Sequence, residues 1–218
     1  MIGVAVMGYG VVGSGVVELI DQNNKIFSEK IGQDIAVKHI LDVRDFPGNK
    51  YESLITKDFN DILSDPETEI VCETIGGAKV AYDFTKRCLC AGKSVVTSNK
   101  ELVATHGTEL LALAKEHGVD YMFEAAVGGG IPIIRPLINC LAANRIDKIV
   151  GILNGTTNYI LTKMIKENST FADALKEAQR LGYAEADPSA DVDGKDTCRK
   201  ICILADLAFG KAVEPDKV

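Results

Sequence analysis

Residues 2–13 read IGVAVMGYGVVG, an apolar run followed by a glycine-rich turn and the start of a helical pattern. The spacing G-x-G-x-x-G between a strand and a helix is typical of a dinucleotide-binding βαβ unit. Its first glycine permits the tight turn, the second lets a pyrophosphate approach the backbone, and the third lets the helix pack closely on the strand. A glycine-rich turn without a ligand is the alternative interpretation. The predicted cofactor-binding residues are Gly8, Gly10, Val11, Val12 and Gly13, at the N-terminus of the helix.

The segments that follow alternate between strand and helix patterns. Strands are expected at residues 2–7, 35–41, 70–74, 94–97 and 119–123, and helices at 11–22, 79–91 and 101–116. Residues 23–34 look like an insertion before the second strand. The alternation predicts an α/β fold, a Rossmann-like doubly wound parallel sheet covered by helices on both faces.

The pattern changes at the three consecutive glycines 128–130, where we expect a domain boundary. A helix strained by Pro136 is expected at 131–143, a strand at 147–153, and helices at 158–167, 171–181 and 196–209. The sequence therefore predicts a dinucleotide-binding domain at residues 1–130. A partial α+β domain is expected at residues 131–218.

Composition excludes several classes of protein. The chain has 218 residues and a net charge of −7, which argues against nucleic acid or an anionic membrane as a partner. The N-terminus lacks the basic start of a signal peptide, and no apolar run reaches the ~18–20 residues of a membrane span. We expect a cytoplasmic protein that acts on a small molecule.

Cysteine and histidine usage gives no sign of a zinc site. The six cysteines form no C-x-x-C pair, and the three histidines are scattered. We expect buried or partly buried reduced thiols, as is usual for a cytosolic protein, in preference to disulfides or a metal framework.

The end of the second predicted strand bears on the choice between NAD and NADP. An acidic residue there would bond the ribose hydroxyls, whereas a basic residue would bind a 2′-phosphate. Residues 41–45 read LDVRD and offer both, with Asp42, Arg44 and Asp45. We favour NADP through Arg44 and keep NAD as the alternative.

Two polar stretches lie in the second predicted domain. Residues 154–158 read NGTTN and could be an ordinary helix cap, a role that is compatible with lining a site. Residues 185–196 contain five carboxylates, which could form a solvated acidic loop. However, Asp196 and Lys200 are four residues apart on one helix face and can meet. Carboxylates beside a lysine suit an amino-acid substrate, whose ammonium needs anions and whose reacting oxygen needs a proton donor.

The residues of this region resemble the signature of homoserine dehydrogenases. The matching pattern runs from Ala178 through Gly182-Tyr183-Ala184, Asp187-Pro188, Asp191-Val192, Gly194 and Asp196 to Lys200. TSNKELVA (97–104), EAAVGGGIPII (124–134) and GILNGTTNYIL (151–161) resemble other stretches of the same family, in the expected order. The resemblance implies NAD(P)H-dependent interconversion of L-aspartate 4-semialdehyde and L-homoserine, in threonine and methionine biosynthesis.

The resemblance also implies roles for individual residues. Lys200 resembles the family's catalytic proton donor, with Asp196 orienting it and the substrate. Glu185 resembles the substrate-binding glutamate, with Asp191 in support, and Lys100 matches a lysine at the junction of cofactor and substrate. Gly182 matches a backbone contact to the cofactor. The implied monovalent-cation site, for sodium, consists of Glu124 and the carbonyls of Val127, Gly129 and Ile131.

The sequence departs from the family in two respects. Ala186 stands where the family often has proline, which softens the loop without removing a functional group. Family members also continue well past residue 218, so we expect a fragment whose full-length form is a homodimer. The alternatives are a fragment that binds NAD(P) without catalysis and a two-domain dehydrogenase with another aldehyde or alcohol substrate.

Overall fold

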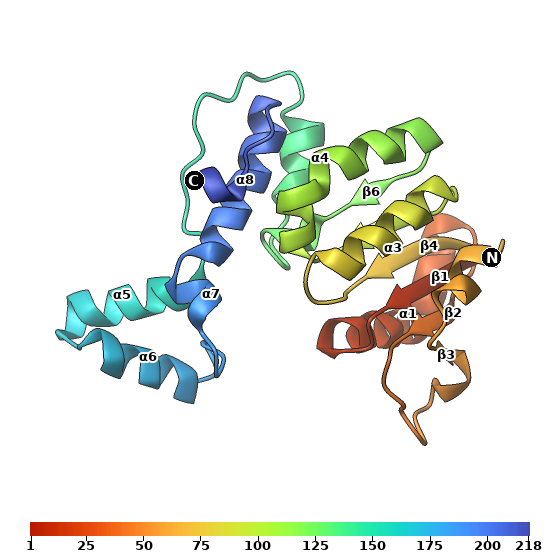
Figure 1. Cartoon of the computed structure of the whole chain (residues 1–218), viewed down its shortest axis with the longest axis horizontal. Coiled ribbons are helices and arrows are strands. Elements are labelled where there is room, and N and C mark those ends of the chain that lie inside the picture. The colour runs from red at the N-terminus through yellow and green to blue at the C-terminus, as the bar shows by residue number, and fades with distance from the viewer. The chain divides into compact units, whose positions relative to one another are not determined.

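A computed structural model describes all residues from Met1 to Val218. Contacts within the chain divide it into two compact units, Met1–Ile131 and Pro132–Val218, which we name unit 1 and unit 2. Unit 1 contains a sheet with flanking helices, and unit 2 contains helices and irregular segments (Figure 1). None of the helices is both long enough and apolar enough to cross a bilayer.

Unit 1 is built on a six-stranded sheet with the order β3-β2-β1-β4-β5-β6, and every neighbouring pair is parallel. The order reverses between β1 and β4, and ligands of such sheets bind outside the carboxyl ends of the strands at this point. The predicted doubly wound α/β fold is confirmed. The strands are β1 (Ile2–Met7), β2 (Ile35–Leu41), β3 (Ile55–Thr56), β4 (Thr68–Glu73), β5 (Ser94–Thr97) and β6 (Tyr121–Met122).

The helices of unit 1 cover both faces of the sheet. The connection from β1 to β2 through α1 runs toward one edge of the sheet, whereas the connections from β4 to β5 through α3 and from β5 to β6 through α4 run toward the other edge. Because such crossovers are right-handed, α1 lies on the opposite face of the sheet from α3 and α4. Figure 1 shows α3 and α4 side by side. The helices are α1 (Val11–Ile31), α2 (Phe59–Ser64), α3 (Lys79–Cys90) and α4 (Lys100–His117), with short 3₁₀ turns η1 (Glu52–Leu54) and η2 (Glu124–Ala126).

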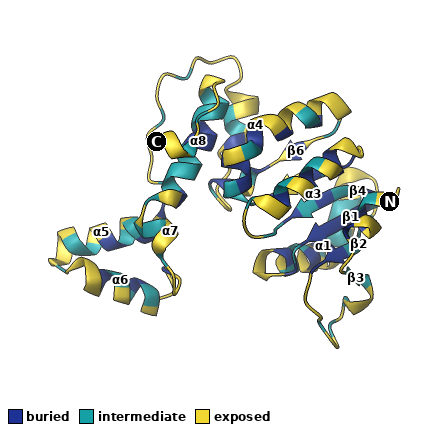
Figure 2. Cartoon of the chain, viewed as in Figure 1, coloured by how far each residue is buried: buried dark blue, intermediate teal, exposed yellow.

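The centre of the sheet forms the core of unit 1. Residues 4–7 of β1 are at most 1% exposed, as expected for a strand covered on both faces. Val6 packs with Val17 of α1 and Ile40 of β2, which fixes the helix that follows the glycine turn against the sheet. Figure 2 shows the same concentration of buried residues in the strands.

The first helix is longer than predicted from the sequence. Residues 23–31, expected to be an insertion, continue α1 to Ile31, and the helix ends at Gly32 in the left-handed conformation, with φ 74°. Nothing before Gly32 breaks the helix. Its last turns are tied to the segment that follows, because the Ser28 hydroxyl donates to Asp34 Oδ1 at 2.7 Å and Asn24 Oδ1 accepts the Ile35 backbone N–H at 3.3 Å. The short elements β3 and α2 were not predicted, because segments of two and six residues carry too little periodicity.

Unit 2 is helical. Its elements are the π-helical turn η3 (Pro136–Cys140), the helices α5 (Gly155–Glu167), α6 (Phe171–Arg180), α7 (Ser189–Val192) and α8 (Lys195–Phe209), and the 3₁₀ turn η4 (Pro215–Lys217). The helix expected at 131–143 is shorter, because Pro136 has no N–H to donate. The Leu141 N–H instead reaches back five residues to the Pro136 carbonyl at 3.1 Å.

The strand expected at residues 147–153 does not form. The segment has no strand assignment, and Val150 and Ile152 are 78% and 76% exposed. A strand needs a neighbour for its backbone hydrogen bonds, and unit 2 contains no other strand. The α+β prediction for this part of the chain is therefore wrong for the residues present, which are α-helical or irregular.

All six cysteines are free, as predicted, but they are not all buried. Cys88 and Cys202 are buried, and Cys72 and Cys198 are partly buried. Cys90 and Cys140 are exposed, contrary to the prediction, because the helical turns that carry them present these positions to solvent. No group of three or more histidine, cysteine, aspartate or glutamate side chains could hold a metal ion.

Candidate functional site

The glycine turn joins β1 to α1 at the carboxyl edge of the sheet. Gly8 has φ +95°, a conformation that side-chain-bearing residues rarely adopt. A Cβ on Gly13 would lie 1.8 Å from the Gly8 carbonyl oxygen, so only glycine permits this approach of helix to turn. Gly10 is the N-cap of α1 and no side chain caps the helix. The helix N-terminus is therefore available to an external anion.

The space outside the turn fits a pyrophosphate. A Cβ built on Gly10 meets no atom of the chain within 4 Å, and Val11 is 93% exposed. An apolar side chain this exposed at the first turn of a helix is unusual, and it lies where a dinucleotide would cover it. Val12 is also exposed, whereas Gly13 is buried. The predicted cofactor-binding residues thus lie together on one turn.

Asp42 follows β2 and accepts four hydrogen bonds. Its carboxylate receives the Tyr9 backbone N–H at 2.8 Å, and from Arg44 the backbone N–H (2.9 Å), Nε (3.0 Å) and a terminal nitrogen (2.9 Å). A carboxylate offers about four lone-pair positions, so both oxygens are fully used. The hydrogen bonds from the Arg44 side chain hold the pKa of Asp42 far below its usual value, although burial opposes this.

Arg44 is positioned by these contacts and remains accessible. The same terminal nitrogen also donates to the Tyr9 carbonyl (3.1 Å), and the guanidinium lies 5.0 Å from the centre of the Phe46 ring. Its side chain is 58% exposed. Asp45, the other acidic residue of this segment, pairs with Lys57 at 2.7 Å. The end of β2 therefore presents a fixed cation next to the glycine turn, whereas the Asp42 carboxylate is already occupied.

The loop after β4 lies beside the glycine turn. The Thr74 hydroxyl bonds the Gly8 carbonyl at 2.8 Å, and Asn99 Nδ2 donates to the Gly77 carbonyl at 2.7 Å. Asn99 also caps α4 by accepting the Leu102 N–H at 3.1 Å. Lys100, a predicted catalytic and cofactor-binding residue, is the first residue of that helix.

Unit 2 brings together a lysine, two aspartates and an asparagine. Lys200 Nζ lies 2.8 Å from Oδ2 of Asp196 and donates to the Leu153 carbonyl at 2.9 Å. Asn154 Nδ2 donates to Asp196 at 2.9 Å and to Asp191 at 2.7 Å. The Asp196 and Lys200 side chains are 4% and 16% exposed, so this is a largely desolvated cluster. The predicted meeting of Asp196 and Lys200 across one helical turn is present.

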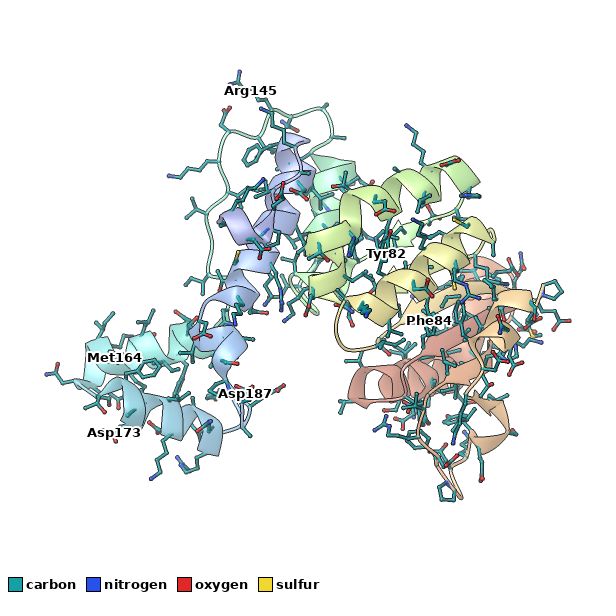
Figure 3. The ribbon with its side chains drawn as sticks, viewed as in Figure 1. Tyr82, Phe84, Arg145, Met164, Asp173 and Asp187 are labelled. Carbon is teal, nitrogen blue, oxygen red and sulfur yellow. The ribbon has the colours of Figure 1, made fainter.

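Other predicted residues lie outside this cluster. Glu185 is exposed, and its backbone carbonyl accepts from Gln179 at 3.1 Å. Gly182, with φ +79°, follows the end of α6, and its N–H donates to the Gln179 carbonyl at 3.1 Å. Asp187, labelled in Figure 3, lies in the loop between α6 and α7, where its carboxylate accepts the Ser189 N–H at 3.1 Å. A cavity of about 360 Å³ is lined by Gly155, Thr156, Tyr159 and Tyr183.

The segment proposed to bind a cation ends unit 1. Glu124 begins the 3₁₀ turn η2, and Val127, which follows it, is 7% exposed. Gly129 has φ +57°, and the Ile131 N–H closes a tight turn onto the Gly128 carbonyl at 3.0 Å. The segment thus consists of tight turns, and backbone carbonyls are among the oxygen ligands that hard cations use.

Two residues, Asn154 and Glu73, make contacts that were not predicted from the sequence. Asn154 was predicted as part of a helix cap that could also line a site, but its hydrogen bonds to both aspartates of the cluster were not predicted. Its position directly after an apolar stretch was the available signal. Glu73 was not identified at all, although a glutamate ending an apolar strand is unusual in a buried parallel sheet.

Comparisons with known proteins agree with both units. Residues 8–124 match the family described as "Homoserine dehydrogenase, NAD binding domain", and residues 132–218 match "Homoserine dehydrogenase". The chain is 46% identical to the homoserine dehydrogenase of Bacillus subtilis over 219 residues, covering 99% of this chain and 50% of that protein. It is 42% identical to the enzyme of Lactococcus lactis, covering 52% of it. The chain thus spans about half the length of the curated relatives it matches.

Solved structures give the same result. The crystal structure of a homoserine dehydrogenase from Thiobacillus denitrificans has a TM-score of 0.88 at 42% identity, over 99% of this chain and 50% of that one. A hyperthermophilic archaeal homoserine dehydrogenase in complex with NADPH has a TM-score of 0.82 at 31% identity, over 97% of this chain and 70% of that one. On sequence and fold together, the chain belongs to the homoserine dehydrogenase family.

Proposed function

We propose that this chain carries the catalytic residues of an NADP-dependent homoserine dehydrogenase, which interconverts L-aspartate 4-semialdehyde and L-homoserine. The observation that carries the proposal is the buried Lys200–Asp196 pair with Asn154 and Asp191, in a chain of this family. It supplies a proton donor and carboxylates, the two things that an amino-acid aldehyde requires. The pathway we propose is threonine and methionine biosynthesis, and the full-length form we propose is a homodimer.

The residues of unit 1 would hold the cofactor. The glycine turn from Gly8 to Gly13 would bind the pyrophosphate, with Lys100 at the nicotinamide end. Arg44 favours NADP, because it is exposed and fixed, while the Asp42 oxygens that would bond a free ribose hydroxyl are already filled. When bound, the reduced cofactor supplies a hydride to the aldehyde carbon.

Lys200 would donate a proton to the aldehyde oxygen, so that the carbonyl becomes an alcohol. Asp196 and the Leu153 carbonyl orient its ammonium, and the remaining N–H can point at the substrate. Asp191 and Glu185 would bind the substrate ammonium. Gly182 would contact the cofactor through its backbone. We also propose a sodium site formed by Glu124 and the carbonyls of Val127, Gly129 and Ile131.

The proposal is tested by homoserine-dependent reduction of NADP and of NAD by the purified chain, followed at 340 nm. We expect turnover with homoserine and preference for NADP. Binding of NADPH without turnover would support a cofactor-binding role only, and the assay would then be repeated on a chain extended at its C-terminus. Absence of turnover in both chains would contradict the dehydrogenase assignment.

A further inference from the structure

A buried carboxyl lies beneath the loop that follows β4. Glu73 ends that strand and is 0% exposed. Its Oε1 accepts the Ile75 N–H at 2.7 Å, and its Oε2 bonds the Thr97 hydroxyl at 2.5 Å. Burial raises the pKa of Glu73, although the hydrogen bonds that it accepts oppose this shift. A carboxyl buried this deeply is unfavourable unless its oxygens have such partners.

Asn99 forms hydrogen bonds with both partners of Glu73, Thr97 and Ile75. The Thr97 oxygen accepts the Asn99 backbone N–H at 2.9 Å, and Asn99 Nδ2 donates to the Ile75 carbonyl at 3.0 Å. Glu73, Ile75, Asn99 and Thr97 therefore form a closed ring of four hydrogen bonds. Because Asn99 also caps α4, the ring ties the loop after β4 to the helix that begins at Lys100.

This ring is placed where the cofactor is proposed to bind. It lies at the carboxyl ends of β4 and β5, and Thr74 links the same loop to the Gly8 carbonyl at 2.8 Å. Packing alone does not require a carboxyl here, since moving a polar group from water into an apolar interior costs free energy. A buried carboxyl that lowers stability, yet is held by a complete hydrogen-bond network, is typical of a residue that positions neighbouring parts of a binding site.

We propose that Glu73 is a positioning residue, which holds residues 75–77 and the Lys100 end of α4 in the geometry that binds the dinucleotide. The proposal rests on the proposed function in one respect, that the dinucleotide binds at this edge of the sheet. Glu73 acts through Ile75, Thr97 and Asn99 and is not assigned any contact with a ligand.

The test uses Glu73→Gln and the matched pair Thr97→Val and Thr97→Ser. Glu73→Gln keeps an acceptor for the Ile75 N–H and puts an NH2 donor where an oxygen accepts the Thr97 hydroxyl. Thr97→Val removes both hydrogen bonds of the Thr97 oxygen, the one to Glu73 and the one from the Asn99 N–H. Disturbing the ring is expected to raise the Kd for NADPH about tenfold in both variants. The double variant should lose no more affinity than Thr97→Val alone, and Thr97→Ser should bind like the original chain.

Hydrogen exchange in the unliganded chain provides a second readout. The Ile75 and Leu102 amides, which donate to Glu73 and Asn99, should exchange faster in Glu73→Gln and Thr97→Val. The increase should be larger than any change in the unfolding midpoint accounts for. Thr85→Val is the control, because the buried Thr85 hydroxyl, on α3, has no hydrogen-bond partner and lies outside the ring. It should leave both readouts unchanged.

Three results would overturn the proposal: unchanged local exchange, an unchanged Kd in both variants, or a weaker Kd that follows only a lowered unfolding midpoint. If the original chain does not bind NADPH, the proposed function fails separately. In that case faster exchange at residues 75–77 in the variants still supports the positioning role of Glu73, and unchanged exchange refutes it.

Discussion

Lys200 Nζ and Asp196 Oδ2 lie 2.8 Å apart, one turn of α8 from each other, and both side chains are nearly buried. The Leu153 carbonyl accepts a hydrogen bond from a second N–H of the ammonium at 2.9 Å. A lysine has three N–H donors, so one remains for a further acceptor. The two acceptors thus fix the direction of the remaining N–H.

Removing this donor should abolish turnover and leave cofactor binding intact. In Lys200→Ala, kcat should fall by a factor on the order of 10²–10⁴, the usual contribution of a positioned general acid. The Kd for NADPH, measured by fluorescence titration, should change less than about twofold, because the proposed cofactor-binding turn is in unit 1. Lys195→Ala is the matched control, since Lys195 is an exposed lysine on the same helix. Activity in Lys200→Ala close to that of Lys195→Ala would exclude Lys200 as the proton donor.

Arg44 should decide between the two dinucleotides. In Arg44→Ala the Kd for NADPH should rise about tenfold or more, because a charge-assisted contact contributes about 1.5–3 kcal/mol. The Kd for NADH should stay constant or fall, since Asp42 regains oxygens that can accept ribose hydroxyls. Arg87→Ala, at an arginine that pairs with Asp83 on α3, is the control. Equal losses for NADPH and NADH would mean that Arg44 does not recognise the 2′-phosphate.

Much of unit 1 could be predicted from local sequence because each signal has a local cause. The glycine spacing, the apolar run of β1 and the glycine at the end of α4 each act within a few residues. The meeting of Asp196 and Lys200 was predictable for the same reason, since four residues make one helical turn.

Other features depend on residues far apart in the chain. The Glu73 ring joins β4 to β5 over 24 residues, and no periodic pattern announces such a contact. Residues 147–153 have the composition of a strand, but strand formation depends on a neighbouring strand, and unit 2 supplies none. The strand preference of a segment therefore predicts a strand only where a neighbouring strand can pair with it.

Thiol reactivity should follow burial. Burial raises the pKa of Cys72 to about 11 and that of Cys88 to about 12, so little thiolate is present at pH 8. Cys90 and Cys140 are exposed and should be alkylated first by iodoacetamide in the native chain. Peptide mass spectrometry after timed labelling measures the order, and labelling in denaturant is the control in which all six react. Labelling of Cys72 or Cys88 as fast as Cys90 would contradict the burial seen here.

Acid should destabilise unit 1 partly through Asp65. Its carboxylate accepts the Glu67 N–H (2.9 Å), the Thr68 hydroxyl (2.8 Å) and bonds His39 (2.9 Å), and these contacts lower its pKa to about 2 despite some burial. A depressed pKa in the folded state gives stability that is fully present above the unfolded value of about 4 and is lost as pH falls toward 2. The free energy of unfolding of Asp65→Asn should therefore change less between pH 4 and pH 2. Urea titrations at several pH values would measure it, and parallel curves for the two proteins would refute the role of Asp65.

Substitution by alanine should lower the stability of the chain at Gly13 and weaken NADPH binding at Gly10. In Gly13→Ala the new methyl would lie 1.8 Å from the Gly8 carbonyl, so the helix must move and the chain should lose about 1–3 kcal/mol of stability or more. In Gly10→Ala the methyl meets nothing in the chain, and φ −84° suits alanine, so stability should hold while NADPH binding weakens because the methyl occupies the pyrophosphate position. Gly15→Ala is the control, since it adds a methyl to the same helix in open space and should stabilise the chain by about 0.5–1 kcal/mol. Thermal unfolding and fluorescence titration of the three variants separate the two effects. Normal NADPH affinity in Gly10→Ala would mean that the dinucleotide does not lie over this turn.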